Sequence, residues 1–369
     1  MIDGIFLQKG TTLLPDDVLL EDVFFNRVQL SKTELEDWDL SRTRVYGSFL
    51  QDTNLKDIGA DRMVRKTTER QSRWMISSGV KTWQALAPHA VGGDNTGLYI
   101  GLGSVDCDES EEHDYIDACT PQSLSEYKLS HNKPLLGLIL LNSTAASHIS
   151  QMTGITGHNC CFAPLTDSGS NALIEAAYDL TEDKIALALC GGGSQKIAPW
   201  YFLAYEDYWQ KHQQLWLTES TSFFTATRES GAGQAQLRHV YRGCLHERDN
   251  PVTQVLSRAL ADAKAADFGL GQIIFIGCLH QQALMGELCR EQAPGVAHCF
   301  IEEQVGYTGA AGMAIGVNLA LTMLEKNLCL EHDQVLDMPA EHKRSVLLVA
   351  LGAEQQISYL SIGDKEVNE

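Results

Sequence analysis

The sequence lacks the features of a membrane-spanning or secreted protein. No apolar run reaches the ~18 residues that a membrane-spanning helix needs, and the run LLGLILL at 135–141 is too short. The ten cysteines form no C-x-x-C pair and no regular spacing, and the first ten residues have no cationic start followed by an apolar core. These absences predict reduced thiols in a cytoplasmic protein. The short apolar run itself indicates a buried strand or an interface.

Basic residues are scarce. The chain has 28 Lys and Arg against 48 Asp and Glu, which gives a formal net charge of −20. A charge of this sign disfavours nucleic acid and anionic membranes as partners. The most basic segment, 61–86, predicts one long helix that carries Arg62, Arg65, Lys66 and Arg70. A solvated face is the favoured interpretation of these cations, and a docking surface for an acidic partner is the alternative.

Signatures of cofactors and metals are also missing. The G-x-G at 101–103 continues into no dinucleotide-binding fingerprint. The acidic cluster DCDESEEHD at 106–114 does not have the spacing of a calcium loop, so a solvated loop is expected there. We therefore predict no cofactor and no metal.

The sequence does contain enough apolar residues for a large core. It has 369 residues, of which 44% are hydrophobic, and this suits one large domain or two fused halves. Its central stretch is 154–177, GITGHNCCFAPLTDSGSNALIEAA, which predicts a turn, a buried strand at 160–165, a sharp corner and a helix. The buried face of that helix is predicted to carry Ala172, Leu173, Ala176, Ala177 and Leu180.

The corner before this helix is a favourable place for a nucleophile, because a helix N-terminus stabilises negative charge. The stretch from Gly154 to Gly169 aligns without a gap with the pattern G-x-x-G-P-x-x-x-x-x-x-A-C-x-S-G, and so resembles the nucleophile elbow of β-ketoacyl synthases. His158 stands in place of the proline, and Thr166 in place of the nucleophilic cysteine. A threonine hydroxyl is a weak nucleophile near neutral pH unless a base activates it.

Two further stretches resemble the same family and depart from it at functional positions. EEQVGYTGAAG at 302–312 is similar to K-x-x-x-G-H-x-x-G-A-A-G, with Glu302 at the lysine position and Tyr307 at the histidine position. After the strand predicted at 272–277, the family's N-A-H-G-T-G-T is absent, and its histidine falls on Leu279 or His280. The gating loop F-G-F-G-G is replaced by LGAEQ at 351–355. A lone histidine at a strand end is more often structural, so His280 is not expected to be catalytic.

The resemblance implies a thiolase-like α/β fold, with two similar halves in five layers, α-β-α-β-α. Residues 1–231 would form the N-terminal ketosynthase-like half with cap insertions, and residues 232–369 the C-terminal half. The segment 198–228 is interpreted as a cap or an extension on the first half. Strands are predicted at 97–104, 185–189, 345–351 and 357–362, and helices at 251–265 and 309–326. The resemblance is weak before residue 60, and no role is predicted for that segment.

Because the catalytic positions depart together, the chain is not expected to be an enzyme. It resembles a chain length factor, the inactive half of a ketosynthase heterodimer, most closely those of aryl polyene biosynthesis. Such a subunit pairs with a catalytic β-ketoacyl synthase, and the acidity of this chain implies that an acyl carrier protein would dock mainly on that partner. The resemblance places the interface and acyl tunnel at Leu135, Leu136, Leu138, Cys160, Cys161, Phe162 and Leu165.

Two alternatives belong to other classes. An active acyltransferase, hydrolase or condensing enzyme would use Thr166 with an unfamiliar base, or a cysteine. Against the second option, Cys160 and Cys161 lie in an apolar run, where cysteines are usually inert packing residues. A homodimeric binding protein for long acyl chains is the other alternative.

Overall fold

A computed structural model describes most of the chain. The described residues are 4–35, 45–86, 92–103, 135–139, 141–163, 166–198, 216–229, 235–246, 251–264, 269–331, 334–338, 344–352 and 355–364. The acidic cluster at 106–114 lies outside them, as do Leu165 and the side chains of Leu136 and Leu279.

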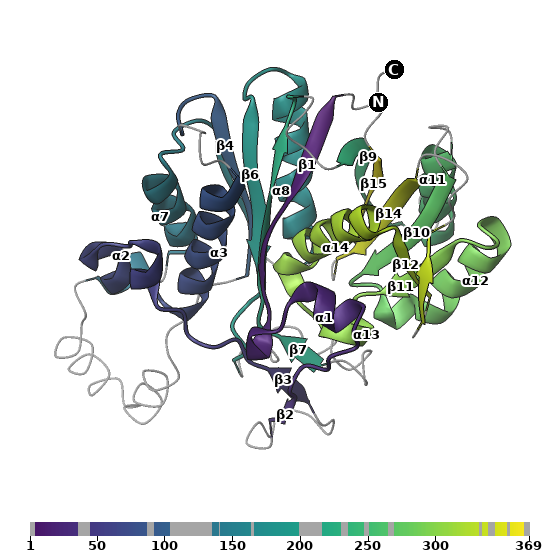
Figure 1. Ribbon diagram of the computed structural model, residues 1–369, viewed down its shortest axis with the longest axis horizontal. Helices are drawn as coiled ribbons and strands as arrows, with labels where there is room; N and C mark the ends of the chain where they lie inside the picture. The colour runs from purple at the N-terminus through teal and green to yellow at the C-terminus, as the bar shows by residue number, and fades with distance from the viewer. Residues whose placement is uncertain are drawn as a thin grey trace.

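The centre of the molecule is a ten-stranded sheet with the order β11-β10-β14-β15-β9-β1-β8-β6-β4-β5 (Figure 1). Its strands are β1 (Ile5–Leu13), β4 (Thr96–Leu102), β5 (Asn159–Phe162), β6 (Leu187–Gly193), β8 (Thr221–Thr227), β9 (Ala235–Cys244), β10 (Gly269–Ile276), β11 (Ala297–Phe300), β14 (Arg344–Leu351) and β15 (Gln356–Asp364). Both directions of pairing occur, so the sheet is mixed.

The sheet contains the same strand order twice. β1, β4, β5, β6 and β8 form one group, in which the strands lie in the order third, second, fourth, fifth, first. β9, β10, β11, β14 and β15 repeat that order. In each group the fifth strand is antiparallel to both neighbours, whereas the second strand is parallel to the third and the fourth. The groups meet where β1 pairs with β9.

Two helices lie between the groups and contact strands of both, namely α8 (Thr166–Thr181) and α14 (Gly312–Lys326). Residues Gly312 to Leu324 of α14 are all buried, as expected for a helix that is apolar all round. On the far side of the first group lie α3 (Arg70–Leu86) and α7 (Thr144–Thr153), and on that of the second lie α11 (Val252–Lys264) and α12 (Gln282–Gln292) (Figure 1).

The corner predicted from the sequence is present. Gly154, with φ 73°, ends α7 in a left-handed conformation, which favours glycine. β5 follows, and α8 begins at Thr166 with the predicted apolar face buried. The strand is not buried, however. β5 is the edge of the sheet, and its residues are alternately exposed and half-buried.

The interpretation of 135–141 as a strand is wrong. Residues Leu136–Ile139 form the short helix α6, in which Leu135 O accepts hydrogen bonds from the N–H groups of Leu138 and Ile139. Leucine favours helices over strands, and no neighbouring strand pairs with this segment among the described residues. Leu138 and Leu141 are each 50% exposed.

The helix predicted at 61–86 is two helices. α2 (Arg62–Lys66) begins where the Asp61 carboxylate accepts from the N–H of Val64. Glu69 in turn accepts from the N–H groups of Gln71 and Ser72 at the start of α3. The capping carboxylates explain the break, because each satisfies N–H groups that a new helix start leaves unpaired. Arg70 is not part of a solvated face, since it pairs with the buried Glu219.

Most other predicted elements are found near their expected positions, with three exceptions. The glycines at 191–193 lie inside β6 instead of closing the strand. The segment 198–228 supplies β8, an internal strand of the main sheet, so its described part is not a cap. β1 was not predicted, although it lies near the middle of the sheet.

Short elements complete the described fold. They are α1 (Leu20–Phe24), the small sheet β2 (Thr33–Glu34), β3 (Tyr46–Ser48) and β7 (Trp216–Thr218), the hairpin β12 (Leu328–Glu331) and β13 (Gln334–Asp337), and α13 (Glu302–Val305). Among the described residues, no helix is both long and apolar enough to cross a membrane.

Candidate functional site

Thr166 is the first residue of α8 and is 1% exposed. Its Oγ1 donates a hydrogen bond to the hydroxyl oxygen of Tyr307, 3.1 Å away and also buried. The structure therefore brings together two of the positions that the sequence singled out, although 141 residues separate them. The threonine hydroxyl is engaged within the protein instead of facing solvent.

The backbone of Tyr307 is held by the small sheet. Its N–H donates to Trp216 O at 2.8 Å, and its O accepts from the Thr218 N–H at 2.9 Å. Gly306, just before it, has φ 71°, and a Cβ there would lie 2.6 Å from both Thr218 Oγ1 and Trp216 Nε1. Only glycine fits this position, because it combines a left-handed backbone with close packing. The segment before Tyr307 is thus fixed by β7.

The end of β10 also reaches this site. A Cβ on Gly277, whose φ is 69°, would lie 3.2 Å from Thr166 Cγ2 and 3.3 Å from Thr166 Oγ1. On the other side of α8, a Cβ on Gly352 would lie 3.0 Å from Asp167 Oδ1. The first turn of α8 is therefore enclosed by the ends of β10 and β14. In α/β folds, the carboxyl ends of parallel strands are where ligands usually bind.

Glu302, at the start of α13, completes the cluster. It is 2% exposed, and its Oε1 accepts a hydrogen bond from the Gly277 N–H. Its Oε2 is buried and has no hydrogen-bond partner among the described residues. Burial raises the pKa of Glu302 to about 7, against the opposing effect of the Gly277 N–H. A buried, unpaired oxygen of this kind costs stability whenever the carboxyl is ionised.

The remaining catalytic-position candidate lies apart from this cluster. His280 is exposed in the 3₁₀ turn Leu279–Gln281 that follows β10.

Cys160 and Cys161 lie on the edge strand β5. Burial raises the pKa of Cys160 and raises that of Cys161 to about 11, so both remain thiols at neutral pH.

The predicted interface residues lie on two segments, β5 and the region of α6. Cys160 and Phe162 are half-buried on β5, while Cys161 is exposed. Leu135 is half-buried and Leu138 half-exposed around α6. The outer backbone groups of β5 are unpaired among the described strands, a feature that favours pairing with another chain.

Sequence reasoning missed the anchor of Tyr307. Trp216 and Thr218 lie in the segment 198–228, and nothing local in the sequence indicates that β7 pairs with Tyr307. The glycine before Tyr307 was the available signal, because a glycine at a left-handed position often reports a close backbone approach.

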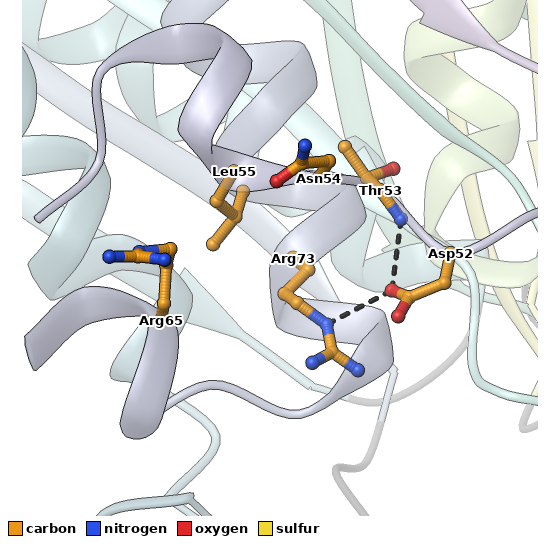
Figure 2. A pocket seen from close by; sticks show the side chains of 6 residues that line it. All are labelled: Asp52, Thr53, Asn54, Leu55, Arg65 and Arg73. Atoms are coloured by element: carbon orange, nitrogen blue, oxygen red, sulfur yellow. Dashed lines mark hydrogen bonds and ion pairs between the residues drawn. The ribbon is translucent and has the colours of Figure 1, made fainter. Parts of the chain in front are cut away.

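A surface depression lies elsewhere, beside the basic helices. It has a volume of about 290 Å³ and is lined by Asp52, Thr53, Asn54, Leu55, Arg65 and Arg73 (Figure 2). The Arg73 Nε lies 3.0 Å from Asp52 Oδ1, so that carboxylate partly neutralises the cationic lining. No residue of the Thr166 cluster lines it.

Comparisons with known proteins agree with the fold described above. Residues 25–209 match the family described as Beta-ketoacyl synthase, N-terminal domain. The ketosynthase from module 6 of the bacillaene synthase of Bacillus subtilis is 11% identical with a TM-score of 0.74, and the match covers 99% of this chain and 72% of that one. An oxazolomycin ketosynthase domain from Streptomyces albus is 13% identical, with a TM-score of 0.76 and coverage of 100% and 76%. No curated protein matches.

A β-ketoacyl synthase from Burkholderia phymatum is similar over nearly the whole of both chains. It is 13% identical with a TM-score of 0.75, and the match covers 98% of this chain and 99% of that one. At such identities the likeness establishes the fold. The predicted mixed α/β, thiolase-like fold is thus confirmed.

Proposed function

The chain belongs to the β-ketoacyl synthase family, and from that premise we propose that it is a non-catalytic chain length factor. It pairs with a catalytic β-ketoacyl synthase and shapes the tunnel that receives the growing acyl chain. The pathway is of the polyketide or polyene type, with aryl polyene biosynthesis as the specific proposal. An acyl carrier protein docks mainly on the catalytic partner, because this chain carries a net charge of −20.

The observation that carries the proposal is the hydrogen bond between Thr166 and Tyr307. Covalent acyl transfer needs an exposed, activated nucleophile. Thr166 is buried, and its hydroxyl is bonded to a phenol whose usual pKa is far too high for it to serve as a base near neutral pH. The family's nucleophile position is therefore occupied by a packed hydroxyl pair.

The charge around the site supports the same conclusion. A condensing enzyme needs hydrogen-bond donors or positive charge where an enolate or oxyanion develops. Here Oε1 of Glu302 accepts a hydrogen bond from the Gly277 N–H, so that donor is already engaged. Asp167 adds a carboxylate in the first turn of α8. The Asp167 carboxylate, and that of Glu302 whenever it is ionised, oppose a developing anion.

The edge of the sheet supports pairing with another subunit. β5 offers backbone groups that no described strand pairs, and Leu138 and Leu141 are half-exposed beside α7. Apolar surface of this kind is usually covered by a partner in obligate complexes. Leu135, Leu138, Cys160, Cys161 and Phe162 are the described residues that we assign to this interface and to the tunnel wall.

We also propose that the chain consists of two similar halves in five layers, with the boundary between residues 231 and 232. The repeated strand order supports this division, and so does the position of α8 and α14 between the two groups.

The first test measures covalent chemistry. The purified chain is incubated with an acyl thioester and its intact mass is recorded, with an active synthase as the positive control. We expect no acyl adduct on this chain. A stoichiometric adduct that disappears in Thr166→Val would overturn the non-catalytic assignment.

The second test measures pairing. A tagged copy is co-expressed with each active β-ketoacyl synthase encoded in the same genome, and the mass of the purified species is measured in solution. We expect a one-to-one heterodimer with one of them. A stable homodimer that excludes every synthase would favour the acyl-binding alternative instead.

One observation favours an active enzyme as the second candidate. The unpartnered Oε2 of Glu302 is a buried acceptor, and the same carboxyl bonds Gly277, which adjoins Thr166. A carboxyl with a pKa of about 7 would suit a general base. If this candidate were correct, turnover of a thioester by the isolated chain would be lost in both Glu302→Gln and Thr166→Val.

A further inference from the structure

A buried carboxylate lies beside the first residues of β5, away from the Thr166 cluster. Asp179 on α8 is 4% exposed and accepts three hydrogen bonds. They come from the Tyr99 hydroxyl at 2.6 Å, His158 Nδ1 at 2.9 Å and Lys184 Nζ at 3.0 Å. The donors thus belong to β4, to the residue preceding β5 and to the turn after α8.

The charge state of this cluster orients the imidazole of His158. Burial by itself would raise the pKa of Asp179, but the hydrogen bonds from Tyr99, His158 and Lys184 hold it below its usual value. Asp179 is therefore a carboxylate without a proton, and Nδ1 of His158 must be the donor in their bond. Nε2 is then the ring nitrogen that is left for a hydrogen bond outside this cluster.

The bond to His158 is not needed to satisfy Asp179. Tyr99 already donates to Oδ2, and Lys184 already donates to Oδ1, so each carboxylate oxygen has a partner without the histidine. The additional bond fixes one edge of the imidazole, while 49% of the side chain remains exposed. A half-exposed ring held in one orientation by a buried carboxylate is preorganised for a contact outside this chain.

His158 stands at the open edge of the sheet. Its O accepts from the Leu98 N–H at 2.8 Å, which extends the pairing of β4 and β5 by one residue. Because side chains alternate along a strand, His158 shares a face with Cys160 and Phe162, which we assign to the partner interface. The exposed part of the His158 ring therefore lies beside the surface that we assign to the second subunit.

We propose that His158 selects the catalytic partner, by forming a hydrogen bond through Nε2 with a group on the ketosynthase subunit. This inference rests on the proposed function. A ketosynthase partner is favoured over a second copy of this chain, since two copies that each carry a charge of −20 repel one another across a shared edge. His158 stands where the family pattern has proline, whose side chain can form no hydrogen bond.

Three substitutions separate partner recognition from anchoring of the strand. His158→Asn keeps an amide N–H near the position of Nδ1 but does not reach the position of Nε2. His158→Gln places an amide near Nε2 and gives up the bond to Asp179, and His158→Phe removes both groups. For each variant, the dissociation constant is measured with the synthase that pairs in the co-expression assay, and the unfolding temperature of the isolated chain is measured separately.

The two measurements should respond differently. We expect the dissociation constant to rise about tenfold in His158→Asn and His158→Phe, and to change by less than about twofold in His158→Gln. The unfolding temperature should fall in His158→Gln and His158→Phe but not in His158→Asn. His239→Asn is the matched control, because His239 lies on β9 in the middle of the sheet, away from β5.

Recognition by His158 is overturned if His158→Asn binds the synthase as tightly as the unmodified chain, or if His158→Gln binds as weakly as His158→Phe. Both results would leave the chain length factor proposal intact, because the heterodimer itself would still form. If the unmodified chain pairs with no synthase, the proposed function and this inference are both wrong.

Discussion

At the scale of single residues, the site depends on a pair of buried hydroxyl groups. Thr166 and Tyr307 are 1% and 3% exposed, and the resemblance aligns them with the nucleophilic cysteine and a histidine of the family. A buried hydroxyl that loses its partner costs ≈ 1–3 kcal/mol, whereas removal of both partners is nearly neutral. Each hydroxyl therefore depends on the other, and loss of either one alone should destabilise the fold.

Tyr307→Phe tests this pair directly. The substitution keeps the ring and removes the oxygen that Thr166 contacts, so the free energy of unfolding should fall by about 1–3 kcal/mol in urea denaturation. Thr166→Val combined with Tyr307→Phe should cost less than the sum of the two single changes, since both partners are then removed. Strict additivity would contradict the hydrogen bond.

Glu302 gives the chain a pH-dependent stability. Its pKa is about 7 in the fold against a usual value of 4.5, so the folded state binds a proton that the unfolded state releases between these values. Stability from this group is present below pH ~4.5 and is lost as the pH rises through about 7, with a total change of up to about 3 kcal/mol.

The measurement compares the unmodified chain with Glu302→Gln, whose amide cannot ionise. The difference in free energy of unfolding between the two proteins should move in favour of Glu302→Gln as the pH rises from about 5 to about 8. Glu219 has a pKa of about 7 through burial but is present in both proteins, so its effect cancels. A difference that stays constant with pH would show that Glu302 does not titrate in this window.

At the scale of elements, α3 is attached to the small sheet and to β8 through one ion pair. Arg70 Nη2 lies 2.9 Å from Oε2 of Glu219, which is fully buried between β7 and β8. Glu219 also accepts from the N–H groups of Leu50 and Ile197 at 3.0 and 3.1 Å. One carboxylate thus joins four segments that are distant in sequence.

Arg70→Met should therefore be strongly destabilising. It leaves the carboxylate of Glu219 buried without its cation, at a cost of about 3 kcal/mol in the free energy of unfolding, and the double change with Glu219→Gln should recover part of it. Arg73→Met is the matched control, because Arg73 pairs with the exposed Asp52 and such surface pairs contribute about 0–1 kcal/mol. Equal losses in the two variants would contradict this account.

At the scale of the whole molecule, the proposed function needs a second subunit. Phe162 is half-buried on the edge strand, next to the surface where the partner would sit. Phe162→Ala would enlarge the space beside β5 and leave every residue of the Thr166 cluster unchanged in sequence. In the proposed tunnel, the Phe162 ring limits the length of the acyl chain.

In the heterodimer, Phe162→Ala should shift the products toward longer chains, with turnover by the partner largely retained, as measured by mass spectrometry of the released acyl groups. Leu284→Ala is a suitable control, since Leu284 is an exposed apolar residue on α12, far along the sheet from β5. Unchanged product length across Phe162→Ala and a second change at Leu136 would count against the tunnel proposal.

The sequence by itself was sufficient for the features that depend on local pattern. The corner at 154–177, the helix α11 and the strand pair β14 and β15 follow from apolar periodicity and glycine positions, and they were predicted close to their observed bounds. The departures at Thr166, Glu302 and Tyr307 were also visible in the sequence. Each of these features rests on neighbours along the chain or on a short motif.

Only the tertiary structure decided how these residues meet. In the folded chain Thr166 contacts Tyr307, and Gly277 lies between Thr166 and Glu302. The Tyr307 backbone is hydrogen-bonded to β7. The tertiary structure also made β5 an edge strand and 136–139 a helix, against expectation. The physical reason is that burial and pairing depend on segments far apart in the chain, and the residues at 160–165 do not encode which strand, if any, lies beside them.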